Sequence, residues 1–129
     1  MAPSFLTSDQ VILINKSCLV ATGEHHAVID RGKLDSAVAR PQFGIDGKFF
    51  FPTIPEQGAV LAHALIANHP FEQGNKRTAY SAMQTFLTLN TNILLSNQTH
   101  AFHFITRMAM GKVSTEEAIE WVKKRCESF

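Results

Sequence analysis

The residues best suited to chemistry lie in one stretch, His-Pro-Phe-Glu-Gln-Gly-Asn-Lys-Arg, at positions 69–77. A histidine that is neutral near neutral pH can accept a proton, so His69 is a candidate general base. The residues that follow Gly74 have a helical pattern, and a helix N-terminus presents free N–H groups and a partial positive charge. Lys76 and Arg77 add two cations at the same place. The stretch therefore predicts a phosphate site with a proton acceptor beside it.

The other positions of this stretch have simpler predicted roles. Gly74 lacks a Cβ, so a phosphate can approach the backbone closely. Asn75 can donate its amide to a phosphate oxygen or hold the loop. Lys76 is a compact point charge, and Arg77 can bind phosphate through two parallel donors. The simpler alternative is that these two adjacent cations are solvated, as most Lys-Arg pairs are. Phe71 is predicted to anchor the loop in the core.

The remaining histidines are weaker candidates. His100 and His103 are three residues apart on a predicted helix, but no third metal ligand is evident, which favours surface histidines. His25 and His26 are expected to be solvated in a turn, and His63 is expected to be structural. The sequence has no phosphate-binding Walker loop, zinc-protease motif, nucleophile elbow or Cys-x-x-Cys pair.

Residues 69–77 resemble the signature of the Fic/Doc superfamily, His-x-Phe-x-acidic-Gly/Ala-Asn-x-Arg. The Asn-Lys-Arg ending is typical of the Doc ("death on curing") toxin branch, whereas the Fic branch has Asn-Gly-Arg. The resemblance continues at residues 30–42 and 51–53, and it extends from about residue 5 to residue 125. It implies that His69, Asn75 and Arg77 are catalytic, and that residues 74–77 bind the phosphates of ATP or another nucleoside triphosphate.

The Doc branch also implies a reaction. A toxin of this kind transfers phosphate to a Ser or Thr hydroxyl of a translation protein, with elongation factor Tu as the known target class. Fic-branch enzymes transfer AMP, and they have Gly and a second Arg where this chain has Lys76 and Tyr80. Both differences favour phosphate transfer, and Fic-type nucleotidyl transfer (AMPylation) is the alternative.

One position departs from the family pattern. The acidic ligand for Mg²⁺ is replaced by Gln73, and an amide oxygen is a poorer ligand for a hard dication than a carboxylate. Three interpretations are open: Glu72 substitutes as the ligand, the nucleotide phosphates hold most of the metal, or the chain is a catalytically weak binding module.

Composition limits the class of protein. The chain has 129 residues, 45% of them hydrophobic, which predicts a single domain over residues 1–129, and the resemblance implies that this domain is Fic/Doc-like. The net charge is +1, so we expect neither membrane binding nor direct DNA binding. No signal peptide and no apolar run of about 20 residues is evident, which favours a cytoplasmic protein. Cys18 and Cys126 are expected to be free thiols.

The elements that position these residues are predicted to be helices, giving an all-α fold, and the resemblance implies a compact Fic/Doc-like helical bundle. Capping boxes begin at Thr7 and Ser114, and Pro55 fits the first position of a helix. The apolar periodicity places Phe102, Ile105 and either Met108 or Ala109 inward. The predicted helices span residues 8–21, 31–39, 55–68, 75–90, 97–110 and 115–125.

Residues 42–52 are the exception. Asp46-Gly47 between apolar residues predicts a small β-hairpin, with a connecting loop as the simpler alternative. The resemblance implies that this hairpin is a flap beside the active site, with Phe49, Phe50 and Phe51 aligning the target. It also implies a cognate antitoxin as a separate chain, for which exposed phenylalanines of the hairpin are candidate contacts.

Overall fold

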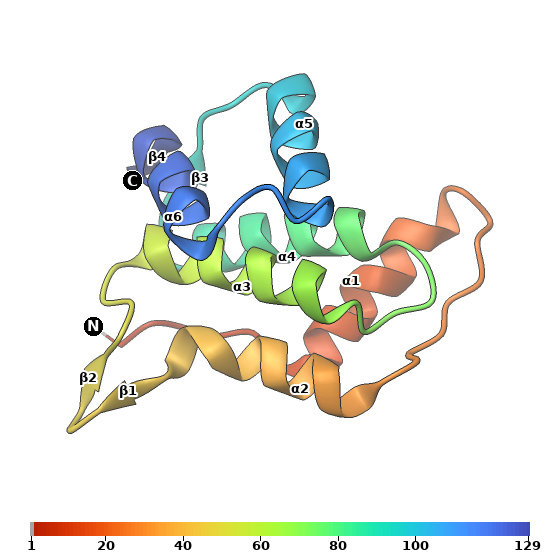
Figure 1. Cartoon of the computed structure of the whole chain (residues 1–129), viewed down its shortest axis with the longest axis horizontal. Helices are drawn as coiled ribbons and strands as arrows, with labels where there is room; N and C mark the ends of the chain where they lie inside the picture. The colour runs from red at the N-terminus through yellow and green to blue at the C-terminus, as the bar shows by residue number, and fades with distance from the viewer. Residues whose placement is uncertain (1) are drawn as a thin grey trace.

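The computed structural model describes residues 2–129, and it is predominantly helical (Figure 1). This confirms the predicted all-α class with a small hairpin. Across the described residues there are six α-helices, a short 3-10 helix and two pairs of short strands. The elements are α1 (Ser8–Val20), α2 (Arg31–Ala39), η1 (Arg40–Gln42), β1 (Gly44–Ile45), β2 (Lys48–Phe49), α3 (Ile54–Asn68), α4 (Asn75–Leu89), β3 (Asn92–Leu94), α5 (Gln98–Ala109), α6 (Thr115–Arg125) and β4 (Cys126–Ser128).

Helix α3 is the central element, and α2, α4 and α6 pack around it (Figure 1). Nearly all of its residues from Gln57 to Ile66 are buried, as expected for a helix that is apolar around its circumference. At Gly58 a Cβ would come within 2.9 Å of Leu87 on α4, so the glycine permits close packing of these two helices. Pro55 occupies the second helical position and not the first, because Ile54 already belongs to the helix.

Helix α1 brings the N-terminal part of the chain against α4. It begins with the predicted capping box, in which Thr7 and Gln10 satisfy each other's backbone N–H groups. Asp30 caps α2 by accepting from the N–H of Lys33. These local interactions set the starts of both helices, and Phe71, Phe86 and Leu34 are among the side chains fully buried between the packed elements.

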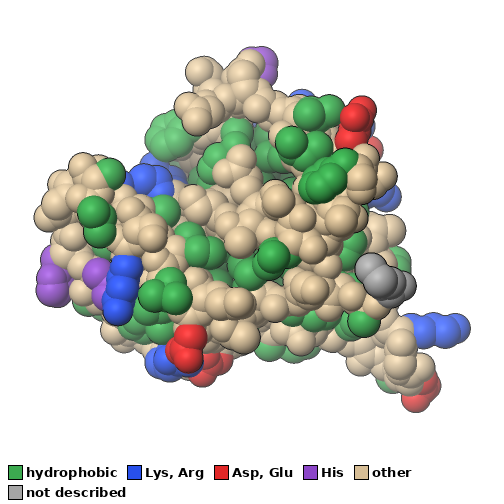
Figure 2. Space-filling model, turned by 180° about the vertical axis from the view of Figure 1, so that it is seen from behind, with side chains coloured by type: hydrophobic (Ala, Val, Ile, Leu, Met, Phe, Trp, Pro, Cys, Tyr) green, Lys and Arg blue, Asp and Glu red, His purple; other side chains and the backbone are tan. Residues whose placement is uncertain are grey.

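The predicted hairpin is present, with β1 and β2 antiparallel and Gly44 opposite Phe49. Asp46 and Gly47 both have positive φ, 51° and 76°, as a tight hairpin turn requires. The hairpin precedes the N-terminal end of α3 and projects from the body of the molecule (Figures 1 and 2). Its tip carries charged side chains of both signs (Figure 2).

Strands β3 and β4 were not predicted. Asn92–Leu94 pairs antiparallel with Cys126–Ser128, so the end of the chain is tied to the segment after α4. Each strand has three residues, which is too short for an apolar alternation to show in the sequence.

Helix α5 corrects part of the predicted core. Ile105 and Met108 are buried as expected, but Phe102 is 58% exposed and Phe104 takes the inward place, stacked on Trp121 with ring centroids 4.1 Å apart. Ala109 is also exposed. Among residues 2–129, no helix combines the length and the apolar character that crossing a membrane requires.

Candidate functional site

The predicted phosphate loop joins α3 to α4, and a left-handed residue stands at each end of it. His69 is the C-cap of α3 with φ 47° and ψ 58°, and its N–H donates to the carbonyl of Leu65 at 3.2 Å. Gly74 is the N-cap of α4 with φ 77°. These two conformations turn the chain sharply, so that the end of α3 and the start of α4 face the same space.

Two side chains hold the loop from within. Phe71 is 1% exposed and anchors the loop in the core, as predicted. Asn75 closes the loop: its Nδ2 donates to the Phe71 carbonyl at 2.8 Å, and its Oδ1 accepts from the Phe71 N–H at 3.1 Å. Of the two roles predicted for Asn75, the structure therefore displays the loop-holding one.

The segment before α2 holds the loop from outside. The N–H of Ile29 donates to the Pro70 carbonyl at 2.9 Å, and the N–H of Glu72 donates to the Ala27 carbonyl at 2.9 Å. Val28 and Phe71 form an isolated antiparallel bridge. The loop is thus braced by backbone pairing to a part of the chain about forty residues earlier in the sequence.

Asn15 of α1 is a third support that the sequence did not reveal. It is fully buried, and its Nδ2 donates to the Gln73 carbonyl at 3.0 Å and to Thr78 Oγ1 at 2.9 Å. Its Oδ1 is then the acceptor for His26 Nδ1, which must carry the proton. His26 was expected to be solvated, but it is half-buried, and burial followed by the nearby Lys16 and His25 lowers its pKa. In the sequence, the only indication of this role was that Asn15 is a polar residue at an inward-facing position of a helix.

The first turn of α4 is left open to an anion. Gly74 has no side chain to cap the helix, and no side chain of the described residues accepts from its first N–H groups. The earliest of the helical bonds is from the Thr78 N–H to the Gly74 carbonyl, at 2.9 Å. The amides of residues 75–77 are therefore available, and the helix dipole adds partial positive charge there.

These groups share one cavity of about 500 Å³, which we call the phosphate cavity. His69 lies in its wall together with the start of α4. A volume of this size is within the usual range for small-molecule sites. The wall consists of Glu24, Ile66, His69, Glu72, Gln73, Gly74, Asn75, Lys76, Arg77, Thr106, Ala109 and Met110.

The hairpin is not part of this wall, which corrects the prediction that residues 42–52 border the site. Strands β1 and β2 precede α3, whereas residues 69–74 follow that helix, so the two lie at opposite ends of α3 (Figure 1). Phe50 is 60% exposed on the hairpin, Phe49 contacts Phe5 edge-on, and the Phe51 carbonyl accepts from Gln57.

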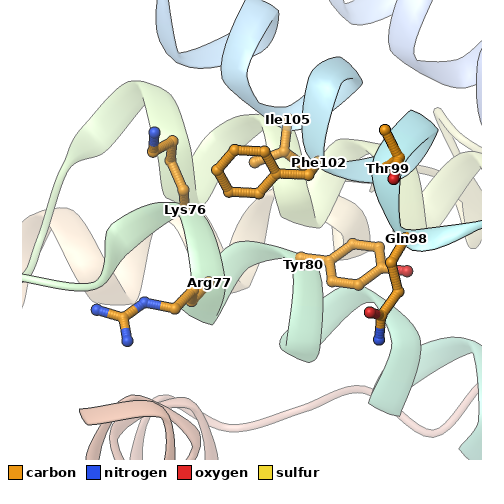
Figure 3. Close-up of a pocket in the computed structure, with 7 residues that line it drawn as sticks. All are labelled: Lys76, Arg77, Tyr80, Gln98, Thr99, Phe102 and Ile105. Carbon is orange, nitrogen blue, oxygen red and sulfur yellow. The ribbon is translucent and has the colours of Figure 1, made fainter. Parts of the chain in front are cut away.

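The two cations of the site point in different directions (Figure 3). Arg77 donates to the Cys18 carbonyl at 3.2 Å and to Thr22 Oγ1 at 3.3 Å, and it forms an ion pair with Glu24. Hydrogen bonds from Thr22 and then from Arg77 lower the pKa of Glu24. Lys76 instead lies over the ring of Phe102, with Nζ 5.2 Å from the ring centroid. Lys76 thus has no carboxylate partner among residues 2–129, whereas Arg77 is paired.

The donors for a divalent cation are few. No cluster of three or more His, Cys, Asp or Glu side chains occurs within the part of the chain that the structure describes. Glu72 lies exposed in the cavity wall, and Gln73 Oε1 and Thr106 Oγ1 are buried there without hydrogen-bond partners. Unpaired oxygens beside one carboxylate fit a Mg²⁺ ion that takes most of its ligands from phosphate and water.

Sequence comparisons identify the family of the chain. The sequence model described as Fic/DOC family matches residues 5–87, which include the whole loop and most of α4. The protein named Toxin Doc from Mycolicibacterium smegmatis is 44% identical over 71 residues, covering 55% of this chain and 55% of that relative. The match thus spans about half the length of the relative. Because the family match covers more than half of this chain, the chain belongs to the Fic/Doc family.

Proposed function

We propose that this chain is a Doc-type toxin that transfers phosphate from a nucleoside triphosphate to a Ser or Thr hydroxyl of a translation protein. The observation that carries the proposal is the shared cavity, in which His69 and the uncapped first turn of α4 line the same space. The similarity to Toxin Doc supports the toxin class. Elongation factor Tu is the target that we propose, following the family resemblance.

In this proposal the transferring phosphate lies against the amides at the start of α4. Lys76 and Arg77 supply positive charge, so the site stabilises the charge on the transferring group, where most catalysis of phosphoryl transfer resides. His69 accepts the proton of the attacking hydroxyl. Asn75 acts by holding the loop that presents those amides.

Mg²⁺ would be held by Glu72 or Gln73 together with the nucleotide phosphates, and it would neutralise phosphate charge. Glu72 is exposed in the cavity wall, and the oxygen of Gln73 is buried and unpaired. The chain's own residues do the remaining work of orienting the phosphates and accepting the proton.

Labelled ATP tests the reaction. The purified chain is incubated with elongation factor Tu and with ATP labelled at either the γ- or the α-phosphate. We expect γ-label on the target, and we expect His69→Ala to reduce it at least a hundredfold. His103→Ala, which removes an exposed histidine of α5, is the matched control and should leave labelling unchanged. Equal labelling by His69→Ala and the parent chain contradicts the role of His69.

Two alternatives are separated by the same assay. Transfer of the α-label would indicate nucleotidyl transfer, although Lys76 stands where the Fic branch has Gly and its long side chain would intrude on the phosphate path of that branch. An absence of both labels together with retained nucleotide binding would indicate a binding module, which the missing carboxylate at Gln73 favours.

A separate antitoxin chain is the proposed partner. Phe43, Ile45 and Phe50 are 49%, 66% and 60% exposed on and beside the hairpin, so they offer apolar contacts. Expression with and without a neighbouring reading frame tests this, and harmless expression of the chain alone at full solubility contradicts it.

A further inference from the structure

A second cavity of about 460 Å³ lies between α4 and α5, and we call it the α4–α5 groove (Figure 3). Lys76, Arg77 and Tyr80 of α4 form one wall, and Gln98, Thr99 and Phe102 of α5 form the other. Ile105, which is 2% exposed, lies at its base. Apart from Lys76 and Arg77, no residue that lines the groove has a role in the proposed chemistry of the phosphate cavity.

The groove adjoins the phosphate cavity, because Lys76 and Arg77 line both. A ligand with its phosphates at the first turn of α4 can therefore continue past these two side chains into the groove. None of the described residues that line the groove is acidic, so the groove wall itself adds no charge repulsion against an anionic ligand.

Phe102 is the feature that points to the occupant. It is 58% exposed although it stands on a helix whose neighbouring apolar side chains are buried. Lys76 Nζ lies over one face of its ring, 5.2 Å from the centroid, and the ring lines the groove across from Tyr80 (Figure 3). A nucleobase can stack on an exposed aromatic ring, and such stacking accepts every base.

The ends of the groove supply polar groups. The side chains of Gln98 and Thr99 have no hydrogen-bond partner among the described residues, and both line the groove near Tyr80 (Figure 3). An amide and a hydroxyl can pair with the edge of a base or with a ribose hydroxyl. The groove thus offers an apolar surface with a few convergent polar groups, as small-molecule sites do.

We infer that the α4–α5 groove binds the base and ribose of the nucleoside triphosphate, with the base stacked on Phe102. This inference rests on the proposed function, because it places the rest of the nucleotide whose phosphates lie at α4. It assigns Phe102 and Gln98 to nucleotide binding, and neither residue belongs to the 69–77 stretch.

Calorimetry on the full chain separates the two parts of the ligand. A non-hydrolysable ATP analogue and inorganic tripolyphosphate are each titrated in the presence of Mg²⁺. We expect the ATP analogue to bind more tightly than tripolyphosphate. Phe102→Ala should weaken binding of the ATP analogue about tenfold, the size of one lost stacking contact, and leave tripolyphosphate unchanged. Phe102→Trp should retain binding of the analogue.

Phe129→Ala is the matched control, since it removes another phenylalanine that is 72% exposed, and it should change neither ligand. Equal affinity of the parent chain and Phe102→Ala for the ATP analogue overturns the inference. A tenfold loss for both ligands also overturns it, because Phe102 would then act only by holding Lys76. In both cases the proposed role of the phosphate cavity is unaffected. Failure of the parent chain to bind either ligand, by contrast, overturns the proposed function as well.

Intermolecular nuclear Overhauser effects give an independent readout. Protons of the base should show contacts to the Phe102 ring in the parent chain and lose them in Phe102→Ala. A different outcome would be that an apolar peptide competes with the ATP analogue and that the base of the analogue shows no contact to Phe102. The groove would then be a contact for a protein, and the inference would be overturned.

Discussion

The guanidinium of Arg77 is paired with the carboxylate of Glu24 at the wall of the phosphate cavity. Thr22 and the Cys18 carbonyl also accept from Arg77, so the end of α1 and the turn after it hold this side chain. The strongest phosphate donor of the site is therefore already engaged by a carboxylate of the same chain. A triphosphate that binds there competes with Glu24 for Arg77 or meets the negative charge beside it.

Replacing Glu24 tests this competition. We expect Glu24→Gln to tighten the binding of tripolyphosphate about threefold at low salt, because one negative charge leaves the cavity wall and the guanidinium is released. Both side chains of the pair are roughly one-third exposed, which keeps the effect small. Calorimetry measures it, and Glu127→Gln, an exposed glutamate on β4, is the matched control. Weaker binding by Glu24→Gln would mean instead that Glu24 orients Arg77 for the ligand.

Gly74 offers a second test, because the energetic cost of its left-handed backbone and the cost of its close contacts can be measured separately. A Cβ at Gly74 would lie 2.9 Å from Leu19 Cδ2 and 3.3 Å from Asn15 Nδ2, and φ is +77°. A Cβ at Gly23 would meet nothing within 4 Å, although φ is +69° there. Both alanine variants should lose about 1–2 kcal/mol for the left-handed backbone, and Gly74→Ala should lose about 1 kcal/mol more for the contacts.

Urea unfolding measures the two free energies. Gly74→Ala should also weaken tripolyphosphate binding, because the new methyl group displaces the loop that presents the α4 amides, whereas Gly23→Ala should not. Equal stability losses in the two variants would show that Leu19 and Asn15 do not constrain Gly74.

Much of the fold could be predicted because its signals are local. The capping box at Thr7 and Gln10 spans one helical turn, and so does the one at Ser114 and Glu117, and both are present. The residues of the phosphate stretch are consecutive, so predicting the start of α4 placed them together. Each predicted helix agrees with an observed helix to within one or two residues at its ends.

The parts that could not be predicted depend on distant contacts. Asn15 and the Gln73 carbonyl are 58 positions apart, and nothing near Asn15 in the sequence indicates that it supports the loop. The choice between Phe102 and Phe104 depends on how α5 is rotated against α6, where Trp121 stacks on Phe104. The hairpin was predicted, but its place at the far end of α3 follows from how η1 and α3 pack.

His26 makes the support of the loop sensitive to pH. Burial lowers its pKa below the ordinary value of 6.5, with Lys16 and His25 acting in the same direction. As pH falls through about 6.5 the unfolded chain binds a proton that the folded chain does not, so stability decreases until the lowered pKa is passed. Above 6.5 both states are neutral and the residue contributes no pH dependence.

Unfolding by urea between pH 5 and 8 measures this. His26 should add a slope to the plot of unfolding free energy against pH. We expect this slope to be a fraction of the single-proton limit of about 1.4 kcal/mol per pH unit, since the ring is partly exposed. His26→Asn keeps a donor for Asn15 and should remove this slope, whereas His103→Asn should not. An unchanged slope in His26→Asn would assign the pH dependence to other groups.

Gln73 decides how far the site depends on a metal. Its Oε1 is buried without a hydrogen-bond partner, and it stands where the family pattern has an acidic residue. A carboxylate at this position would be unpaired in the absence of metal, so Gln73→Glu should lose about 1–3 kcal/mol of unfolding free energy in EDTA. Millimolar Mg²⁺ should restore much of that loss, because a hard dication binds a carboxylate better than an amide.

Gln84→Glu is the matched control, because it adds the same charge at an exposed position of α4 and should respond to Mg²⁺ as the parent chain does. If weak metal binding limits the native chain, Gln73→Glu also increases γ-phosphate transfer. If Glu72 or the nucleotide already supplies enough ligands, transfer is unchanged while the Mg²⁺-dependent stability remains. Stability of Gln73→Glu that is insensitive to Mg²⁺ would show that position 73 does not face a cation, which would leave Glu72 as the residue of the cavity wall to hold one.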